Sequence, residues 1–334
     1  MKQKERNTNI EFLRFILMLF ILIWHIIVHG YKLEEIGTHG FVYEGSMVLS
    51  LFLSTLTLPA TYCFIFISGY FGLTLRLKRL AELYVWCLII SVAQTLVQKY
   101  YLGDSIGVRD LWQSLFPITT GRWWFISAYF KLLLLSPFLN YGMEKLDSKK
   151  QVLSISLIYS ISLFRMVIGK PNAGSDLMGL VFMYLLGRYF RQKGLWSAFK
   201  TKCIYIFSFG CMFSVMLMIY YSSMIFGHLN IQKLIFYCMG FANPFVILMA
   251  ISMFFYVVQL RKSQIGVLNQ LFSPCLFIYL ITEGMGGQIY KALRQVIEFN
   301  FFCGGFCLFS LAFLCLLVGL LIQRLTKLLF SDKL

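Results

Sequence analysis

Charge is scarce in this sequence. Charged residues make up 13% of its 334 residues, whereas about 25% is usual for a soluble domain. Hydrophobic residues make up 59%, and no polar stretch is long enough to form a soluble domain. Whatever chemistry the chain performs is therefore expected in or at a lipid bilayer.

Several functional signatures are also missing. The chain has no phosphate-binding glycine-rich loop, no HExxH, no GxSxG and no kinase motif. It shows no repeat with a period of 20–50 residues. Its nine cysteines lie in apolar runs, with no CxxC pair and no histidine at metal-ligand spacing. We therefore expect no metal site and no disulfide.

Long apolar runs dominate what is present. A membrane-spanning helix needs about 20 mostly apolar residues. Ten runs qualify: 10–29, 47–73, 80–98, 123–141, 151–168, 176–192, 203–226, 234–258, 271–290 and 301–325. The sequence predicts an all-α, polytopic membrane bundle of about ten transmembrane helices.

The basic residues predict the orientation of this bundle. Lys and Arg are concentrated in alternate loops, for example at 76–79, 145–150 and 188–202, and such loops face the cytoplasm. Both termini are then cytoplasmic, in a multi-pass protein of the plasma or inner membrane. The net charge of +16 needs no nucleic acid as a partner, because basic loops also attract anionic membrane lipids.

From Ile10 to Val28, the first apolar run carries three ionisable residues, Glu11, Arg14 and His25. Such groups cost several kcal/mol in hydrocarbon unless they face a partner or a water-filled cavity. Arg14 and His25 share one helix face, about 16 Å apart along the axis. His25 could act as a general base or simply bond a neighbouring helix. A basic group and an imidazole on one face suggest a path through the protein, which Arg14 could line, or Arg14 could only pair with Glu11. His29 is expected to be solvated.

A compact basic turn follows the second run. Arg76, Lys78 and Arg79 place three cations within four residues. Positive-inside topology alone explains such a turn. The alternative is a mouth that grips phosphates, because arginine binds them by bidentate hydrogen bonds.

Two further patterns are candidate functional sites. Arg122, Trp123 and Trp124 begin the fourth run and form either an interfacial aromatic belt or a platform for sugars. Glu283 is an intramembrane carboxylate that could orient or balance a cation. The small residues around Gly69 favour close helix packing.

Together these motifs resemble the acyltransferase 3 family of ten-helix membrane O-acyltransferases. The matching residues, in order, are Glu11, Arg14 and His25; Phe64 to Tyr70; Arg76 and Arg79; and Trp123-Trp124-Phe125 running to Leu135-Ser136-Pro137. The resemblance covers essentially all of residues 1–334, as a single membrane domain without an appended soluble domain.

The resemblance implies an acyl-CoA cosubstrate, usually acetyl-CoA, on the cytoplasmic side. It implies a hydroxyl of a cell-surface glycan or another membrane-associated molecule, such as a lipid-linked saccharide, as acceptor. His25 then corresponds to the functional histidine and Arg14 to its basic partner. The CoA-contacting arginines correspond to Arg76 and Arg79. Family members often carry a histidine in the penultimate helix where this chain has Thr282 and Glu283.

Two other functions stay open at this point. A glycan or lipid transporter or flippase could use the helix face that carries Arg14 and His25 as a path for its substrate. We find no inverted repeat in the sequence, although such repeats are common in transporters. A non-catalytic scaffold could use the charges for packing alone. For the enzyme, direct transfer and a covalent intermediate both fit the residues.

Overall fold

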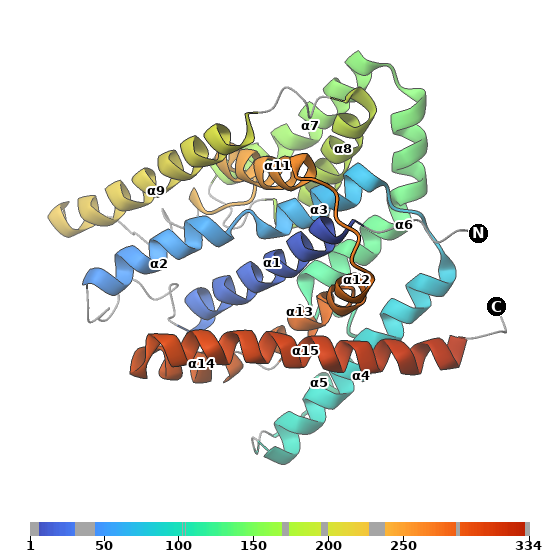
Figure 1. The fold of residues 1–334 in the computed structure, drawn as a ribbon, viewed down its shortest axis with the longest axis vertical. Coiled ribbons are helices and arrows are strands. Elements are labelled where there is room, and N and C mark those ends of the chain that lie inside the picture. The colour runs from blue at the N-terminus through green and yellow to red at the C-terminus, as the bar shows by residue number, and fades with distance from the viewer. Residues whose placement is uncertain are drawn as a thin grey trace. The chain divides into compact units, whose positions relative to one another are not determined.

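The computed structural model describes residues 7–30, 44–101, 103, 105–168, 174–194, 200–226, 238–284 and 288–330. Every regular element within these ranges is a helix (Figure 1), as the sequence predicts. The helices form two compact units, each assembled from separate stretches of the chain.

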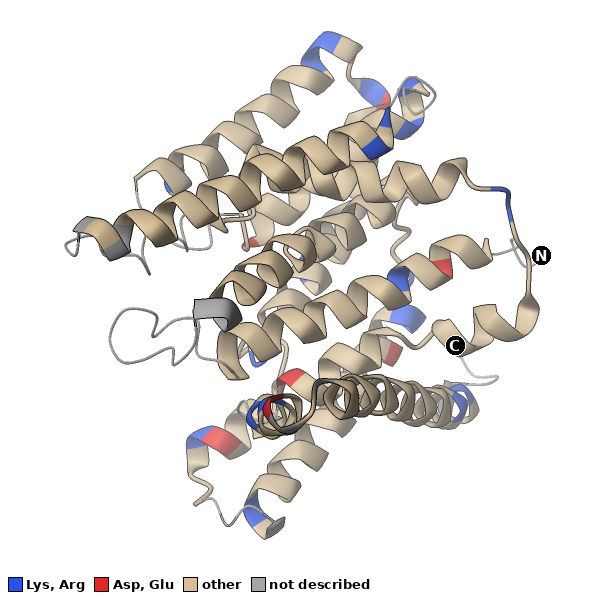
Figure 2. Ribbon diagram, turned by 60° about the vertical axis from the view of Figure 1, so that its left-hand side comes forward, with Lys and Arg blue, Asp and Glu red and all other residues tan. Residues whose placement is uncertain are grey.

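Six helical stretches of the described chain are long and apolar enough to cross a membrane. They are Thr8–Gly30, Met47–Phe71, Leu77–Tyr100, Ser148–Val167, Thr201–Ser222 and Phe302–Leu328, and each coincides with a predicted span. Figure 2 shows that most helices are free of charge along their middle. The chain is thus a helical membrane protein, while the count of ten, the cytoplasmic termini and the identity of the membrane stay predictions.

Three other predicted spans also contain one main helix each. These helices are α6 (Trp124–Lys145), α8 (Leu177–Lys193) and the shorter apolar α11 (Pro244–Gln259).

The predicted span 271–290 is wrong as a single helix. It contains the end of α12 (Gly266–Phe272), all of α13 (Leu276–Glu283) and the start of α14 (Gln288–Phe299). Pro274 ends the first helix because it has no N–H to donate to the carbonyl of Gln270. The hydroxyl of Ser273 donates to that carbonyl instead, at 3.0 Å.

The first unit contains both ends of the described chain. Its helices are α1 (Thr8–His25), the π-helix η1 (Ile26–Gly30), α4 (Leu77–Tyr101), α5 (Val108–Leu115), the start of α6, α12 to α14, and α15 (Phe301–Phe330). Helix α1 packs on α12 and α13, and α15 packs on α12, α13 and α4 (Figure 1). The indole N–H of Trp86 on α4 donates to Thr326 Oγ1 on α15, at 2.9 Å.

Both ends of α1–η1 are anchored by polar contacts. At its start, Thr8 Oγ1 accepts a hydrogen bond from the backbone N–H of Ile265, at 2.8 Å. At its end, Arg294 Nη1 on α14 donates to the carbonyl of Gly30, at 3.1 Å. A Cβ on Gly30 would lie 2.9 Å from the carbonyl oxygen of Tyr290, so glycine permits this close approach. The anchors set the position of α1 relative to α14.

The second unit contains α2 (Glu44–Thr57), α3 (Ala60–Phe71), α7 (Ser148–Val167), α8, α9 (Thr201–Phe226), α11 and the rest of α6. Within this unit, α3 and α8 pack backbone to backbone. A Cβ on Gly69 would lie 2.2 Å from the carbonyl oxygen of Tyr184, and one on Gly187 would lie 2.6 Å from that of Phe66. The close packing predicted around Gly69 is confirmed, since glycines let membrane helices approach backbone to backbone.

We expect Gly69→Ala to destabilise the protein by about 1–3 kcal/mol, because the new methyl group would meet backbone that cannot turn away. The measurement is the melting temperature of the detergent-solubilised protein. Gly210→Ala on α9 is the matched control, because a Cβ there meets nothing within 4 Å. Equal melting temperatures for the two variants would contradict the tight α3–α8 contact.

Candidate active site

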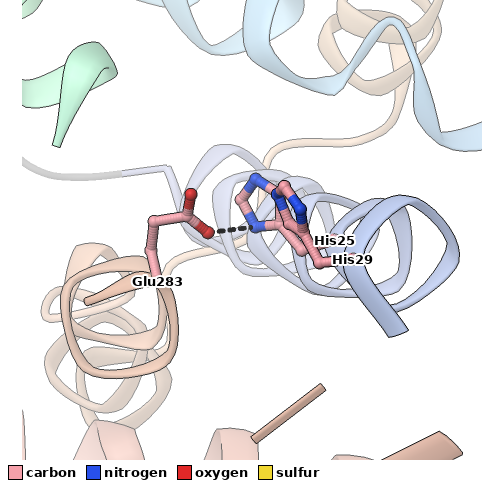
Figure 3. A group of neighbouring side chains, drawn as sticks. All are labelled: His25, His29 and Glu283. Carbon is pink, nitrogen blue, oxygen red and sulfur yellow. Dashed lines mark ion pairs between the residues drawn. The ribbon is translucent and has the colours of Figure 1, made fainter. Parts of the chain in front are cut away.

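The imidazole of His25 lies where α1, α13 and α14 of the first unit converge. His25 is the last residue of α1 and is only 7% exposed. Its Nδ1 lies 3.0 Å from Oε2 of Glu283, the last residue of α13. Figure 3 shows His25 and His29 on one helix, with the carboxylate of Glu283 reaching toward them from another. Two groups that the sequence places far apart thus form one pair, made of a buried imidazole and a partly buried carboxylate.

Tyr290 on α14 completes this group. Its hydroxyl donates to Glu283 Oε2 at 2.8 Å and lies 3.2 Å from Nδ1 of His25. The Tyr290 side chain is 1% exposed, and its ring centroid lies 5.5 Å from that of His25. We call His25, Glu283 and Tyr290 the histidine cluster.

The hydrogen bonds of the histidine cluster indicate which ring nitrogen of His25 can accept a proton. An ionised carboxylate only accepts hydrogen bonds, and the hydroxyl proton of Tyr290 already points to it. With Glu283 ionised, Nδ1 of His25 therefore carries the ring proton. It donates to Oε2 of Glu283 and to the hydroxyl oxygen of Tyr290. The other nitrogen, Nε2, is then left as an acceptor. This is the tautomer that a general base requires.

Helix α13 is clamped at the end that carries Glu283. The side-chain amide of Gln94 on α4 donates to the carbonyls of Leu280 and Ile281, at 2.9 Å each. These bonds satisfy carbonyls that a helix end leaves without partners. A Cβ on Gly284 would lie 1.8 Å from Oε1 of Gln94, so this contact needs glycine.

Arg122 holds the same helix end from a second direction. Its Nη1 donates to Thr95 Oγ1 at 3.0 Å, and its Nη2 donates to the carbonyl of Gly284 at 3.4 Å. Burial lowers the pKa of Arg122, and the charge of Asp110 on α5 opposes that shift. Arginine stays protonated even so, and its positive charge interacts favourably with the negative C-terminal end of the α13 dipole.

Glu11 and Arg14 lie at the other end of α1. Glu11 Oε1 accepts from Arg14 Nη1 at 2.9 Å, which is the i,i+3 ion pair considered from the sequence. Glu11 is buried and Arg14 is partly exposed. They lie about three to four helical turns before His25, so α1 holds them apart from the histidine cluster. Their catalytic role stays a prediction.

The basic turn lies at the start of α4. Arg76 directly precedes the helix and its carbonyl accepts from Leu80 N–H at 3.0 Å, while Lys78 and Arg79 lie in the first turn. All three basic side chains are exposed. The positive end of a helix dipole adds to their charge, which favours an anion at this position. Their contact with CoA stays a prediction.

The predicted acceptor-side residues separate into different environments. Trp123 is 1% exposed and its indole N–H finds no hydrogen-bond partner among the described residues. Trp124 is partly exposed, Arg122 holds α13, and Glu283 pairs with His25. Of the two predicted tryptophans, Trp124 is therefore the one with an accessible indole, and the acceptor roles stay predictions.

Sequence reasoning missed Tyr290 and Gln94. Gln94 had a usable signal, because it is a polar side chain inside an apolar run. Tyr290 had a weaker one, since it follows Glu283 by seven residues, which is about two turns of an uninterrupted helix. Glu283 and Tyr290 belong to separate helices, so their contact depends on how α13 and α14 are placed in the fold.

A family model described as an acyltransferase domain matches residues 7–322, which include all of the histidine cluster and the basic turn. No curated protein and no solved structure matched the chain. The match extends over nearly the whole sequence and confirms the resemblance that the order of motifs indicated. The chain belongs to the acyltransferase 3 family.

Proposed function

We propose that this membrane acyltransferase moves an acyl group, usually acetyl, from cytosolic acyl-CoA to a hydroxyl of a cell-surface glycan or a lipid-linked saccharide. The observation that carries the proposal is the histidine cluster. It supplies a buried imidazole, with an acceptor nitrogen and an orienting carboxylate, inside a member of an acyltransferase family.

The proposed reaction needs one proton acceptor. Nε2 of His25 takes the proton of the acceptor hydroxyl while its oxygen attacks the thioester carbonyl, forming a C–O bond. The C–S bond then breaks, and the CoA sulfur takes the proton back from the imidazolium. A thioester is already activated, so holding the two substrates in line supplies much of the rate.

Glu283 stabilises the transient imidazolium in this scheme. A carboxylate 3.0 Å from Nδ1 attracts the cation strongly because the site is largely shielded from water. Tyr290, Gln94 and Arg122 hold the carboxylate in place through its oxygen and through the end of α13. The charge is therefore positioned before the reaction begins.

Donor binding is assigned to the basic turn. The phosphates of CoA carry several negative charges, and Arg76, Lys78 and Arg79 offer exposed cations beside a helix N-terminus. The acyl-pantetheine arm then extends from this turn along α1 past Arg14 toward His25. For the acceptor, Trp124 offers a ring on which a sugar could stack.

His25→Ala is expected to abolish transfer, because no other group of the histidine cluster offers a neutral acceptor nitrogen. The assay reconstitutes the protein with isotopically labelled acetyl-CoA and measures label in membrane glycans. The variant must be recovered from membranes with a wild-type melting temperature. Label transfer equal to wild type would remove His25 from the mechanism.

Glu283→Gln is expected to lower kcat by about 10²–10⁴-fold, because the amide can still accept from Nδ1 but cannot balance the imidazolium. Tyr290→Phe keeps the ring and should lower kcat by a smaller factor, on the order of tenfold for one lost hydrogen bond. Glu144→Gln, at a largely exposed carboxylate of α6, is the matched control. If Glu283→Gln and the control give the same kcat, the carboxylate has no catalytic role.

Arg76→Ala combined with Arg79→Ala is expected to raise KM for acyl-CoA at least tenfold, since charge-assisted hydrogen bonds are worth about 1.5–3 kcal/mol each. KM for the acceptor should change much less. The control is Lys149→Ala with Lys150→Ala, an exposed basic pair in another predicted cytoplasmic loop. An unchanged donor KM would return the basic turn to a purely topological role.

A further inference from the structure

We propose that His25, His29 and Glu283 form a binding site for a zinc ion, and that zinc at this site inhibits acyl transfer. The inhibition rests on the proposed function, whereas zinc binding does not. No motif in the sequence assigns such a site, because the carboxylate comes from a helix remote in sequence.

The three side chains already approach the geometry of a metal site. One ligand atom from each lies within 4.8 Å of the other two (Figure 3), and Nδ1 of His25 is 3.0 Å from Glu283 Oε2. Zinc bonds of about 2.0–2.2 Å in a tetrahedral arrangement place ligand atoms about 3.3 Å apart. The pair of His25 and Glu283 is thus already at the required spacing. A modest rotation of the exposed His29 side chain would bring the third ligand in.

The donor set favours zinc over the common hard cations. Two imidazoles and one carboxylate are the ligands of well-known catalytic zinc sites, with a fourth position left for water. Magnesium and calcium prefer sites made of oxygen ligands alone. Tyr290 would act as an outer partner, because its hydroxyl already orients the carboxylate at 2.8 Å.

His25 and His29 lie on the same face of the helical stretch formed by α1 and η1. The rings of His25 and His29 lie 5.6 Å apart, and the π-helix begins immediately after His25. That wide turn is held against α14 by the bond from Arg294 to Gly30. His29 also stacks on Tyr290, with ring centroids 5.9 Å apart. The site therefore combines a buried ligand with one at the protein surface, which gives the ion a side from which to enter.

Zinc and catalysis would compete for one ring. When Nδ1 of His25 binds the metal, the single proton of the neutral imidazole must move to Nε2. That nitrogen then donates instead of accepting and cannot take the proton of an acceptor hydroxyl. The metal also neutralises the carboxylate that would stabilise the imidazolium. Occupation of the site is therefore expected to stop transfer.

Calorimetry of the metal-free, full-length protein in detergent tests the binding directly, with zinc chloride as the titrant. Wild type should show one saturable site. His29→Phe keeps an aromatic ring against Tyr290 but removes the ligand, and should weaken zinc binding at least tenfold, since even outer partners of metal ligands are worth about that factor. Glu283→Gln should weaken it similarly.

The exposed cysteines provide the control, because thiolates are the other strong zinc ligands. Cys203→Ser combined with Cys303→Ser removes two exposed thiols and should leave the zinc affinity unchanged. Absence of a saturable site in wild type would overturn the proposal. So would equal affinity in His29→Phe, or binding that is lost only in the cysteine variant.

The transfer assay tests the inhibition separately. Each protein's rate with zinc is divided by its own zinc-free rate, and magnesium chloride serves as the control ion. We expect His29→Phe to need at least tenfold more zinc for half-inhibition. Zinc that binds without slowing transfer would overturn the inhibitory role. Absence of transfer in every metal-free sample would instead count against the proposed function, and calorimetry would still decide the site.

Discussion

The contact between the imidazole of His25 and the carboxylate of Glu283 is the interaction on which the rest of this site depends. Placing either group alone in the apolar interior of a membrane bundle is costly, and the cost falls only when a partner and hydrogen bonds are supplied. The structure supplies both, because Tyr290 bonds the carboxylate and lies against the imidazole. Three helices must therefore meet at one point, and their packing follows from that requirement.

The three helices can converge at the histidine cluster because glycines let neighbouring groups approach the backbone closely. Gly30 lets α14 approach the π-turn that follows His25, and Gly284 lets Gln94 approach the end of α13. In both places a larger residue would displace the group that the glycine admits. The polar side chains that use this space, Gln94 and Arg294, bond backbone carbonyls rather than each other. Each bond fixes a helix end and thereby the side chain that the end carries.

The break of the span 271–290 into separate helices also depends on polar side chains that bond helix ends. Backbone without helical partners is tolerated inside a membrane protein only where the protein itself satisfies it. Gln94 and Arg122 do so at the end of α13, and Ser273 does so where α12 stops. The break places a carboxylate at a helix terminus inside the bundle, where it can reach an imidazole on another helix. An unbroken span would have presented Glu283 in a direction set by helical periodicity alone.

The sequence by itself determined the helical class, the apolar spans, the family and the candidate residue His25. It also allowed the pair of Glu11 and Arg14, because both residues lie on one helix and their spacing is local. Only the tertiary structure decided that Glu283 and Tyr290 meet His25, that Gln94 clamps α13, and that the span 271–290 is broken. The physical reason is that periodicity reports which face of a helix is polar, whereas the partner of that face depends on how distant helices pack.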